Sequence, residues 1–258
     1  MKIYHDPLPD VAKYIDTHRN VTLEDEAQRF ENYLRPVRKL KNITAETEIL
    51  EIGTGTGWFP LLCKLRGLRC KGLEISPQLI GVAWETGRHY GIEPDIELGN
   101  LEDYPLPQNF YDVVIASSVF EHVEDWRTGI RKVYETLKHG GVLFFESTNK
   151  FSFTSGEYTG IPLYGWMPNS WRYALRKRVH GADIMKLGID FHQFTHRGLR
   201  KEFQRVGFSR ILDRMDVAEV EHVSTRFRRA VVGVSKRFAP AKTLALTFAE
   251  VTRFICIK

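Results

Sequence analysis

Three glycines at alternate positions form the most chemically suggestive stretch of the chain. Gly53, Gly55 and Gly57 follow the apolar run 49–52, which contains one acid, Glu51. Glycine adopts backbone conformations that other residues avoid, and without a side chain it lets a ligand lie against the main chain. Apolar residues with helical spacing then resume at Trp58. The pattern predicts a strand, a ligand-binding loop and a helix, in that order.

Two common phosphate-binding fingerprints are absent from this loop. A dinucleotide site needs G-x-G-x-x-G, and a P-loop needs G-x-x-x-x-G-K-[ST]. The spacing here is G-x-G-x-G, and no Lys-Ser or Lys-Thr pair follows it. The loop therefore indicates another kind of cofactor, with an ordinary glycine-rich turn as the alternative.

Two more side chains follow predicted strands. Glu74 lies near the end of segment 70–75, and a carboxylate there can accept hydrogen bonds from both vicinal hydroxyls of a ribose. His122 follows segment 109–118, and an imidazole, which titrates near neutral pH, can take a proton from a substrate hydroxyl. The alternatives are an exposed acid at a strand end and a structural histidine that opens a helix.

The elements that must position these residues alternate between strand and helix patterns. Strands are predicted within 49–52, 70–75, 95–98, 109–118, 142–146, 207–215 and 254–257. Helices are predicted over 130–138, 197–206 and 216–238, and a further one from Thr22, its expected N-cap, with Pro36 as its end or a kink within it. This alternation predicts an α/β fold in which cofactors bind at the carboxyl ends of parallel strands.

Four motifs resemble the class I S-adenosylmethionine (SAM) dependent methyltransferases, in particular the O-methyltransferases of ubiquinone biosynthesis. They are E-x-G-x-G-x-G at 51–57, YDVV with EHV-x-D at 111–125, H-G-G at 139–141, where relatives have proline first, and HQFT at 192–195. The resemblance covers residues 45–150 well and 190–212 loosely. It implies a seven-strand, mostly parallel, doubly wound Rossmann-like sheet whose seventh strand is antiparallel, with a lid insert after the fifth strand.

The resemblance also implies a SAM site at the ends of the first four strands. Its expected residues are Glu51, Gly53, Thr54, Gly55, Gly57, Glu74, Ile75, Asn100, Leu101, Glu102 and Ser117. Glu51 and the glycines would surround the amino-acid part, Glu74 the ribose, and Ser117 would lie near the methionine end. Asn100 stands where relatives carry an aspartate for adenine, but its oxygen still accepts a hydrogen bond.

The implied activity is methyl transfer to a small-molecule acceptor, first of all at a hydroxyl oxygen. His122 is the candidate base, and His192 is a second active-site candidate. No metal belongs to the expected site, although the acid at Glu121 helps to hold a divalent metal in some relatives. The alternatives are nitrogen or carbon methylation, and a SAM- or nucleic-acid-binding protein without transferase activity.

The expected organisation has four parts. Residues 1–44 form a cap whose helix covers the cofactor pocket, with Arg29 and Tyr33 near SAM by the resemblance. Residues 45–150 form the SAM-binding core, 151–190 the substrate lid, and 191–258 complete the sheet around a basic helical insert. The lid mixes aromatic residues with cations, which suits an acceptor that is anionic or partly apolar. A small aromatic subcore is the alternative.

Charge is distributed unevenly along the 258 residues. Residues 1–150 carry 18 Lys and Arg against 23 Asp and Glu, a net charge of −5, whereas residues 151–258 carry 19 against 9, a net charge of +10. The basic part suggests an anionic substrate, nucleic acid or peripheral membrane contact, or simply a solvated surface. No recognisable RNA-binding module accompanies it. Three cysteines without a C-x-x-C pair, and no signal or membrane-spanning run, predict reduced thiols and a cytoplasmic location.

Overall fold

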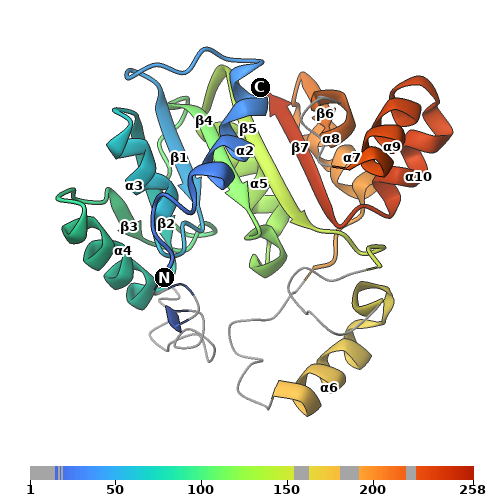
Figure 1. Cartoon of the computed structure of the whole chain (residues 1–258), viewed down its shortest axis with the longest axis horizontal. Helices are drawn as coiled ribbons and strands as arrows, with labels where there is room; N and C mark the ends of the chain where they lie inside the picture. The colour runs from blue at the N-terminus through green and yellow to red at the C-terminus, as the bar shows by residue number, and fades with distance from the viewer. Residues whose placement is uncertain (1–14, 17, 19, 154–162, 181–191, 219–224) are drawn as a thin grey trace.

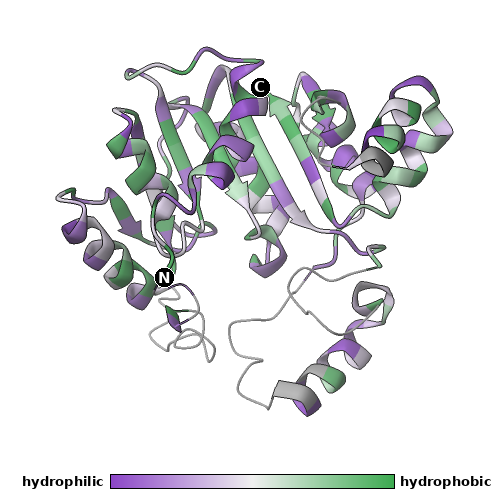
Figure 2. Cartoon of the chain, in the orientation of Figure 1, coloured by the Kyte–Doolittle hydropathy of each residue, from purple (hydrophilic) through white to green (hydrophobic). Residues whose placement is uncertain are grey.

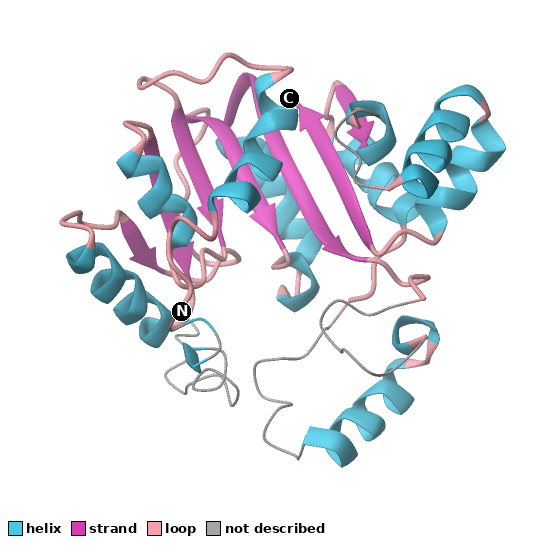
Figure 3. Ribbon diagram, viewed as in Figure 1, coloured by secondary structure: helices cyan, strands magenta, loops and turns pink. Residues whose placement is uncertain are grey.

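The structure is a computed structural model that describes residues 15–16, 18, 20–153, 163–180, 192–218 and 225–258 (Figure 1). The described residues form a seven-stranded sheet with helices packed against both faces (Figure 3). The strands are β1 (Glu48–Ile52), β2 (Arg69–Glu74), β3 (Ile96–Leu98), β4 (Tyr111–Ser117), β5 (Leu137–Thr148), β6 (Arg210–Asp213) and β7 (Val251–Ile257). The predicted α/β class is confirmed.

The sheet has the order β3-β2-β1-β4-β5-β7-β6. β1 to β5 are parallel, and β7 runs antiparallel to both β5 and β6, as predicted. β1 lies between β2 and β4, so the chain leaves β1 toward one edge of the sheet and later returns to build the other. In α/β sheets a ligand crevice opens at such a reversal, outside the carboxyl ends of the strands.

Helices connect and cover the strands. They are α2 (Ala27–Arg38), α3 (Trp58–Leu65), α4 (Pro77–His89), α5 (Trp126–Thr136), α6 (Asn169–His180), α7 (His196–Val206), α8 (Arg214–Val217), α9 (Arg226–Arg237) and α10 (Ala239–Thr247). Two short 3-10 helices, η1 (Phe120–His122) and η2 (Tyr164–Trp166), lie after β4 and before α6.

Two hydrophobic cores lie on opposite faces of the sheet, because successive strand residues point to opposite sides. Val113 contributes to the core beneath α2 and α3, whereas its neighbour Val114 contributes to the core beneath α5 and α7. Phe144 and Phe145 of β5 divide in the same way. Both faces of the central strands are therefore apolar (Figure 2), which explains why they read as continuous apolar runs.

The helix α2 starts later than predicted, and it continues past Pro36, where the sequence predicts an end or a kink. Thr22 and Asp25 form reciprocal contacts, since the Asp25 N–H donates to Thr22 Oγ1 at 3.2 Å and the Thr22 N–H donates to Asp25 Oδ2 at 2.9 Å. These contacts close a turn, and α2 begins only at Ala27. Pro36 lies inside the helix, where burial of Pro36 and Val37 against the core offsets the lost backbone hydrogen bond.

Two predicted boundaries in the second half are also wrong. The helix predicted over 130–138 is α5, which begins at Trp126 because the Asp125 side chain caps it by accepting from the Thr128 N–H at 3.2 Å. Within the single helix predicted over 216–238, the structure describes the end of α8 at Val217 and then α9, and a further helix, α10, follows Phe238. Pro240 stands in the first turn of α10, where its missing N–H costs nothing.

Candidate functional site

The glycine loop after β1 has the backbone that the sequence predicted. Gly53, Gly55 and Gly57 all have positive φ angles, of 68°, 58° and 75°. A Cβ atom on Gly53 would lie 2.5 Å from Cγ2 of Val119, and one on Gly57 would lie 2.5 Å from Cβ of Ala83. The outer two glycines therefore serve close packing within the protein as well as loop shape. The contact with Val119 also brings the residues after β4 against the loop.

Glu51 and Thr54 are held together below the loop. The Thr54 hydroxyl donates to Glu51 Oε2, and both residues are buried. Burial raises the pKa of Glu51 to about 8, although the hydrogen bond from Thr54 and the charge of Arg29 oppose that rise. A carboxyl group with so few compensating contacts favours the arrival of a cationic ligand, which would stabilise its ionised form.

The raised pKa of Glu51 makes folding stability depend on pH. The folded-state pKa of about 8 exceeds the ordinary value of 4.5, so the stability supplied by the neutral carboxyl is complete below pH 4.5 and is lost as the pH rises to about 8. We expect Glu51→Gln, which cannot ionise, to gain free energy of unfolding relative to wild type across this window, by about 4 kcal/mol at pH 8. Urea unfolding at pH 5, 6.5 and 8 measures the difference. Parallel profiles for the two proteins would show that Glu51 is not responsible.

Glu74, at the end of β2, is already tied to the glycine loop. Its Oε2 accepts from the Gly55 N–H at 2.7 Å, and its Oε1 accepts from the N–H groups of Ile75 at 2.9 Å and Ser76 at 3.0 Å. A carboxylate offers about four acceptor positions, so the one left open lies on Oε2, beside Gly55. Only one ribose hydroxyl can therefore donate to Glu74 without displacing a backbone N–H group, whereas the sequence suggested hydrogen bonds from both hydroxyls. Ile75 contributes its backbone N–H.

The residues expected at the adenine end turn partly toward each other. Asn100 Oδ1 accepts from the Glu102 N–H at 3.0 Å, and Glu102 Oε1 accepts from the Asp125 N–H at 2.7 Å. Leu101 is buried and is 3.1 Å from a Cβ placed on Gly129. Glu102 therefore supports the start of α5, and the Asn100 oxygen keeps one lone pair for a ligand.

A chain of polar side chains crosses the carboxyl ends of the strands. Tyr33 of α2 donates to Ser117 Oγ at 2.9 Å and accepts from Arg29 Nε at 3.1 Å. Ser117 also lies 3.5 Å from Glu146 Oε1, and Arg253 Nε donates to Glu146 Oε2 at 2.5 Å. The cap helix is thus linked through β4 and β5 to β7. Glu146 and Arg253 were not identified from the sequence, because they meet only through the β5–β7 pairing.

His122 is the last residue of η1, directly after β4. Its backbone N–H donates to the Val119 carbonyl at 3.0 Å, and Val119 packs against Gly53. His122 is half-buried. The preceding Glu121 is completely buried and accepts from Ser147 Oγ at 2.6 Å. The described residues contain no group of three or more His, Cys, Asp or Glu that could hold a metal ion.

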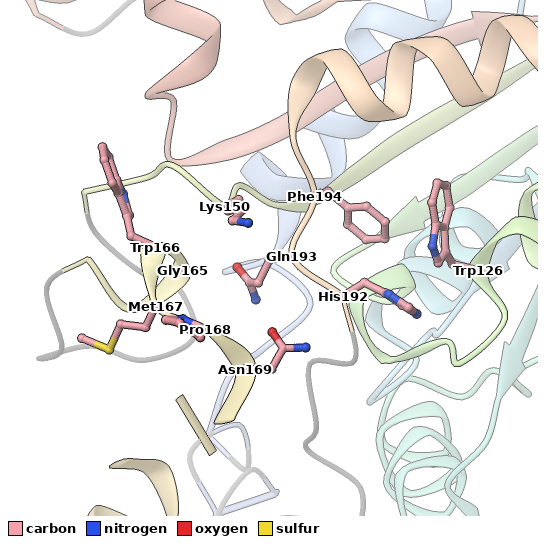
Figure 4. Close-up of a pocket in the computed structure, with 10 residues that line it drawn as sticks. All are labelled: Trp126, Lys150, Gly165, Trp166, Met167, Pro168, Asn169, His192, Gln193 and Phe194. Atoms are coloured by element: carbon pink, nitrogen blue, oxygen red, sulfur yellow. The ribbon is translucent and has the colours of Figure 1, made fainter. Parts of the chain in front are cut away.

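His192 lies against η1 and lines a pocket. Its backbone N–H donates to the Glu121 carbonyl at 3.3 Å, and its Nε2 lies 2.8 Å from the Glu124 carbonyl oxygen. The pocket has a volume of about 530 Å³, and Figure 4 shows the side chains that line it. Its lining residues are Trp126, Lys150, Gly165, Trp166, Met167, Pro168, Asn169, His192, Gln193 and Phe194.

The basic helix predicted in the C-terminal part lies away from this site. α9 and α10 pack on α8 through Met215, Val232 and Leu246, beside the β6 edge of the sheet (Figure 1). Lys242 of α10 binds Asp213 Oδ2 at 2.8 Å. Among the helices that the structure describes, none is both long and apolar enough to cross a lipid bilayer.

Comparisons with known proteins show which family part of the chain belongs to. Residues 50–145 match the methyltransferase domain family. The chain is 29% identical over 123 residues to a ubiquinone biosynthesis O-methyltransferase of Xanthomonas axonopodis, covering 45% of this chain and 51% of that one. It is 28% identical over 145 residues to an ajmaline N-methyltransferase of Rauvolfia serpentina, covering 54% and 48%. The chain thus spans about half the length of these relatives.

A solved structure extends the similarity to the whole fold. A SAM-dependent methyltransferase of Archaeoglobus fulgidus aligns with a TM-score of 0.55 and 16% identity, over 96% of this chain and 99% of that one. The similarity concerns the fold, since the identity is low. Together with the domain match, it confirms the resemblance that the sequence motifs indicated.

Proposed function

We propose, for a chain whose residues 50–145 form a class I SAM-dependent methyltransferase domain, that it transfers the methyl group of SAM to a hydroxyl oxygen of a small-molecule acceptor. One observation carries the proposal. The glycine loop holds Glu74 through the Gly55 N–H and touches Val119, which begins the turn that ends at His122. A nucleotide-type acid, a ligand loop and the segment that carries a candidate base are therefore in contact with one another.

The residues of these segments suit the chemical groups of SAM. Buried Glu51, whose pKa is raised by desolvation, would bind the ammonium group of the methionine part and recover its charge there. The open acceptor position on Glu74 would take one ribose hydroxyl. The remaining lone pair of Asn100 Oδ1 would accept from the adenine amino group. When bound, SAM supplies a methyl group activated by its positive sulfur.

The chain's own part in the reaction would be alignment and proton removal. His122 would take the proton from the acceptor hydroxyl as the oxygen forms its bond to the methyl carbon. Glu121 would act as a positioning residue, because it is buried directly before His122 and is held by Ser147. Methylation at nitrogen is the second candidate, favoured by the similarity to an N-methyltransferase.

Methyl transfer can be tested with SAM labelled in its methyl group. We expect the purified protein to bind SAM in a calorimetric titration and to transfer label to members of a panel of hydroxylated and aminated small molecules. Label on hydroxyl compounds would support oxygen as the target, and label on amines alone would favour the second candidate. No SAM binding under conditions where the protein is folded would refute the proposal.

A further inference from the structure

The pocket beside η1 combines two apolar walls with a polar strip between them. Figure 4 shows Trp126, Phe194 and His192 on one side and Trp166 and Met167 on the other. The side chains of Lys150, Gln193 and Asn169 lie between these walls (Figure 4). A volume of about 530 Å³ is within the usual range for small-molecule sites.

Both apolar walls are held in place by contacts within the protein. The Trp166 indole N–H donates to the Ser152 carbonyl at 3.1 Å, and its ring stacks on Phe248 with centroids 5.9 Å apart. Trp126 meets Phe194 edge to face at 5.1 Å. Aromatic walls that are already ordered lose little conformational entropy when a flat ring packs against them. The pocket therefore favours a planar, aromatic ligand.

The polar strip carries positive charge. Lys150 is the only formally charged residue among the ten that line the pocket, and it is half-buried. Within the described part of the chain, no carboxylate forms an ion pair with the Lys150 ammonium group. The ammonium nitrogen lies 5.9 Å from the centroid of the Phe151 ring. Lys71, Lys138 and Lys242 each bind an acid. A ligand anion would supply the missing partner.

A second cation lies behind the pocket wall and orients one of its amides. Arg172 of α6 is fully buried, and its guanidinium donates to Asn169 Oδ1 at 2.8 Å. With its oxygen held by Arg172, Asn169 turns its NH₂ group, a donor, to the other side. Lys150 and Asn169 then both present donors to the pocket.

The backbone brings the polar strip and the lid together closely. The Lys150 N–H donates to the Phe194 carbonyl at 2.7 Å. A Cβ atom on Gly165 would lie 2.6 Å from the Lys150 carbonyl oxygen and 3.1 Å from Gln193 Oε1. Lys150 is therefore positioned from both sides, by the segment before α7 and by η2.

We infer that this pocket is the acceptor site and that it takes a planar aromatic carboxylate, with Lys150 as the counter-ion of the carboxylate group. The ring would pack against Trp126 and Phe194, the wall that adjoins η1 and therefore His122. One ammonium matches the single charge of a carboxylate, whereas a phosphate monoester would bring nearly two. The inference rests on the proposed methyl transfer, since it names the class of acceptor.

Calorimetric titration with a matched pair of probes tests the inference. 6-Hydroxy-2-naphthoate and 6-hydroxy-2-naphthamide have nearly the same shape, and only the first carries a charge. We expect the wild-type protein to bind the carboxylate about tenfold more tightly or better, because a charge-assisted contact distinguishes the two. Lys150→Met should remove this preference by weakening the carboxylate alone.

Lys177→Met is the matched control, since Lys177 is an exposed lysine of α6 that does not line the pocket. It should leave both affinities unchanged. Equal binding of the two probes by wild type, or equal effects of the two substitutions, would overturn the inference. A SAM titration on the same samples keeps the two proposals apart, because absence of SAM binding sinks the proposed function without altering the probe preference.

Discussion

Glu74→Ala should weaken SAM binding by about 100-fold or more, because the substitution removes a ligand acceptor and the anchor of the loop at once. In the folded protein the Glu74 carboxylate accepts from Gly55, Ile75 and Ser76. Alanine leaves these three backbone N–H groups without that acceptor, so the loop should also lose its defined shape. Calorimetric titration with SAM measures the loss, and circular dichroism verifies that the sheet is retained.

Two variants separate the loop effect from a general loss of stability. Glu74→Gln keeps one oxygen acceptor, so its SAM affinity should lie between those of wild type and Glu74→Ala. Glu97→Ala removes a partly exposed acid of β3, which pairs with Lys71, and should bind SAM as wild type does. If Glu74→Ala bound SAM within twofold of wild type, the assignment of Glu74 to the cofactor would be wrong.

His122→Ala should lower the rate of methyl transfer by about 100-fold or more while SAM affinity stays near that of wild type. The reason is that His122 lies at the end of η1, whereas the glycine loop is held by Glu74 and packs on Val119. Single-turnover transfer of the labelled methyl group measures the chemical step.

Two other histidines provide comparison. His139 is exposed, in the part of β5 that precedes its paired run, so His139→Ala should transfer methyl groups at the wild-type rate. His192 lines the acceptor pocket, so His192→Ala should chiefly raise the KM for the acceptor. Transfer by His122→Ala within a few-fold of wild type, with SAM still bound, would exclude His122 as the base.

The sheet and the loop were predictable because their signals are local. Two-sided burial makes β4 a continuous apolar run, and positive φ angles at alternate residues favour glycine, as at Gly53 and Gly55. Element boundaries were less accurate. α5 begins four residues before the predicted start because the Asp125 side chain caps it, which is a local signal that the prediction did not use. Burial keeps Pro36 inside α2, so there tertiary packing overrode the local preference.

The candidate site was predictable in part. The positions of Glu51, Glu74 and His122 at strand ends follow from the strand pattern alone, since parallel strands end at the same edge of a sheet. The hydrogen bonds that these residues make could not be predicted from that pattern. Nothing in the sequence indicates that the Glu74 carboxylate is already occupied by three backbone donors, or that Glu102 supports Asp125 instead of facing outward.

By itself the sequence determined the class of fold, the order of strand, glycine loop and helix, and the family of the methyltransferase domain, because these depend on residues close together in the chain. Only the tertiary structure decided how Tyr33 reaches Ser117, 84 residues away, and how Arg253 reaches Glu146, 107 residues away. It also decided that Lys150 faces a pocket with Trp126 and Trp166 at its walls. Such contacts join distant segments, and no local pattern specifies which side chains packing will bring together.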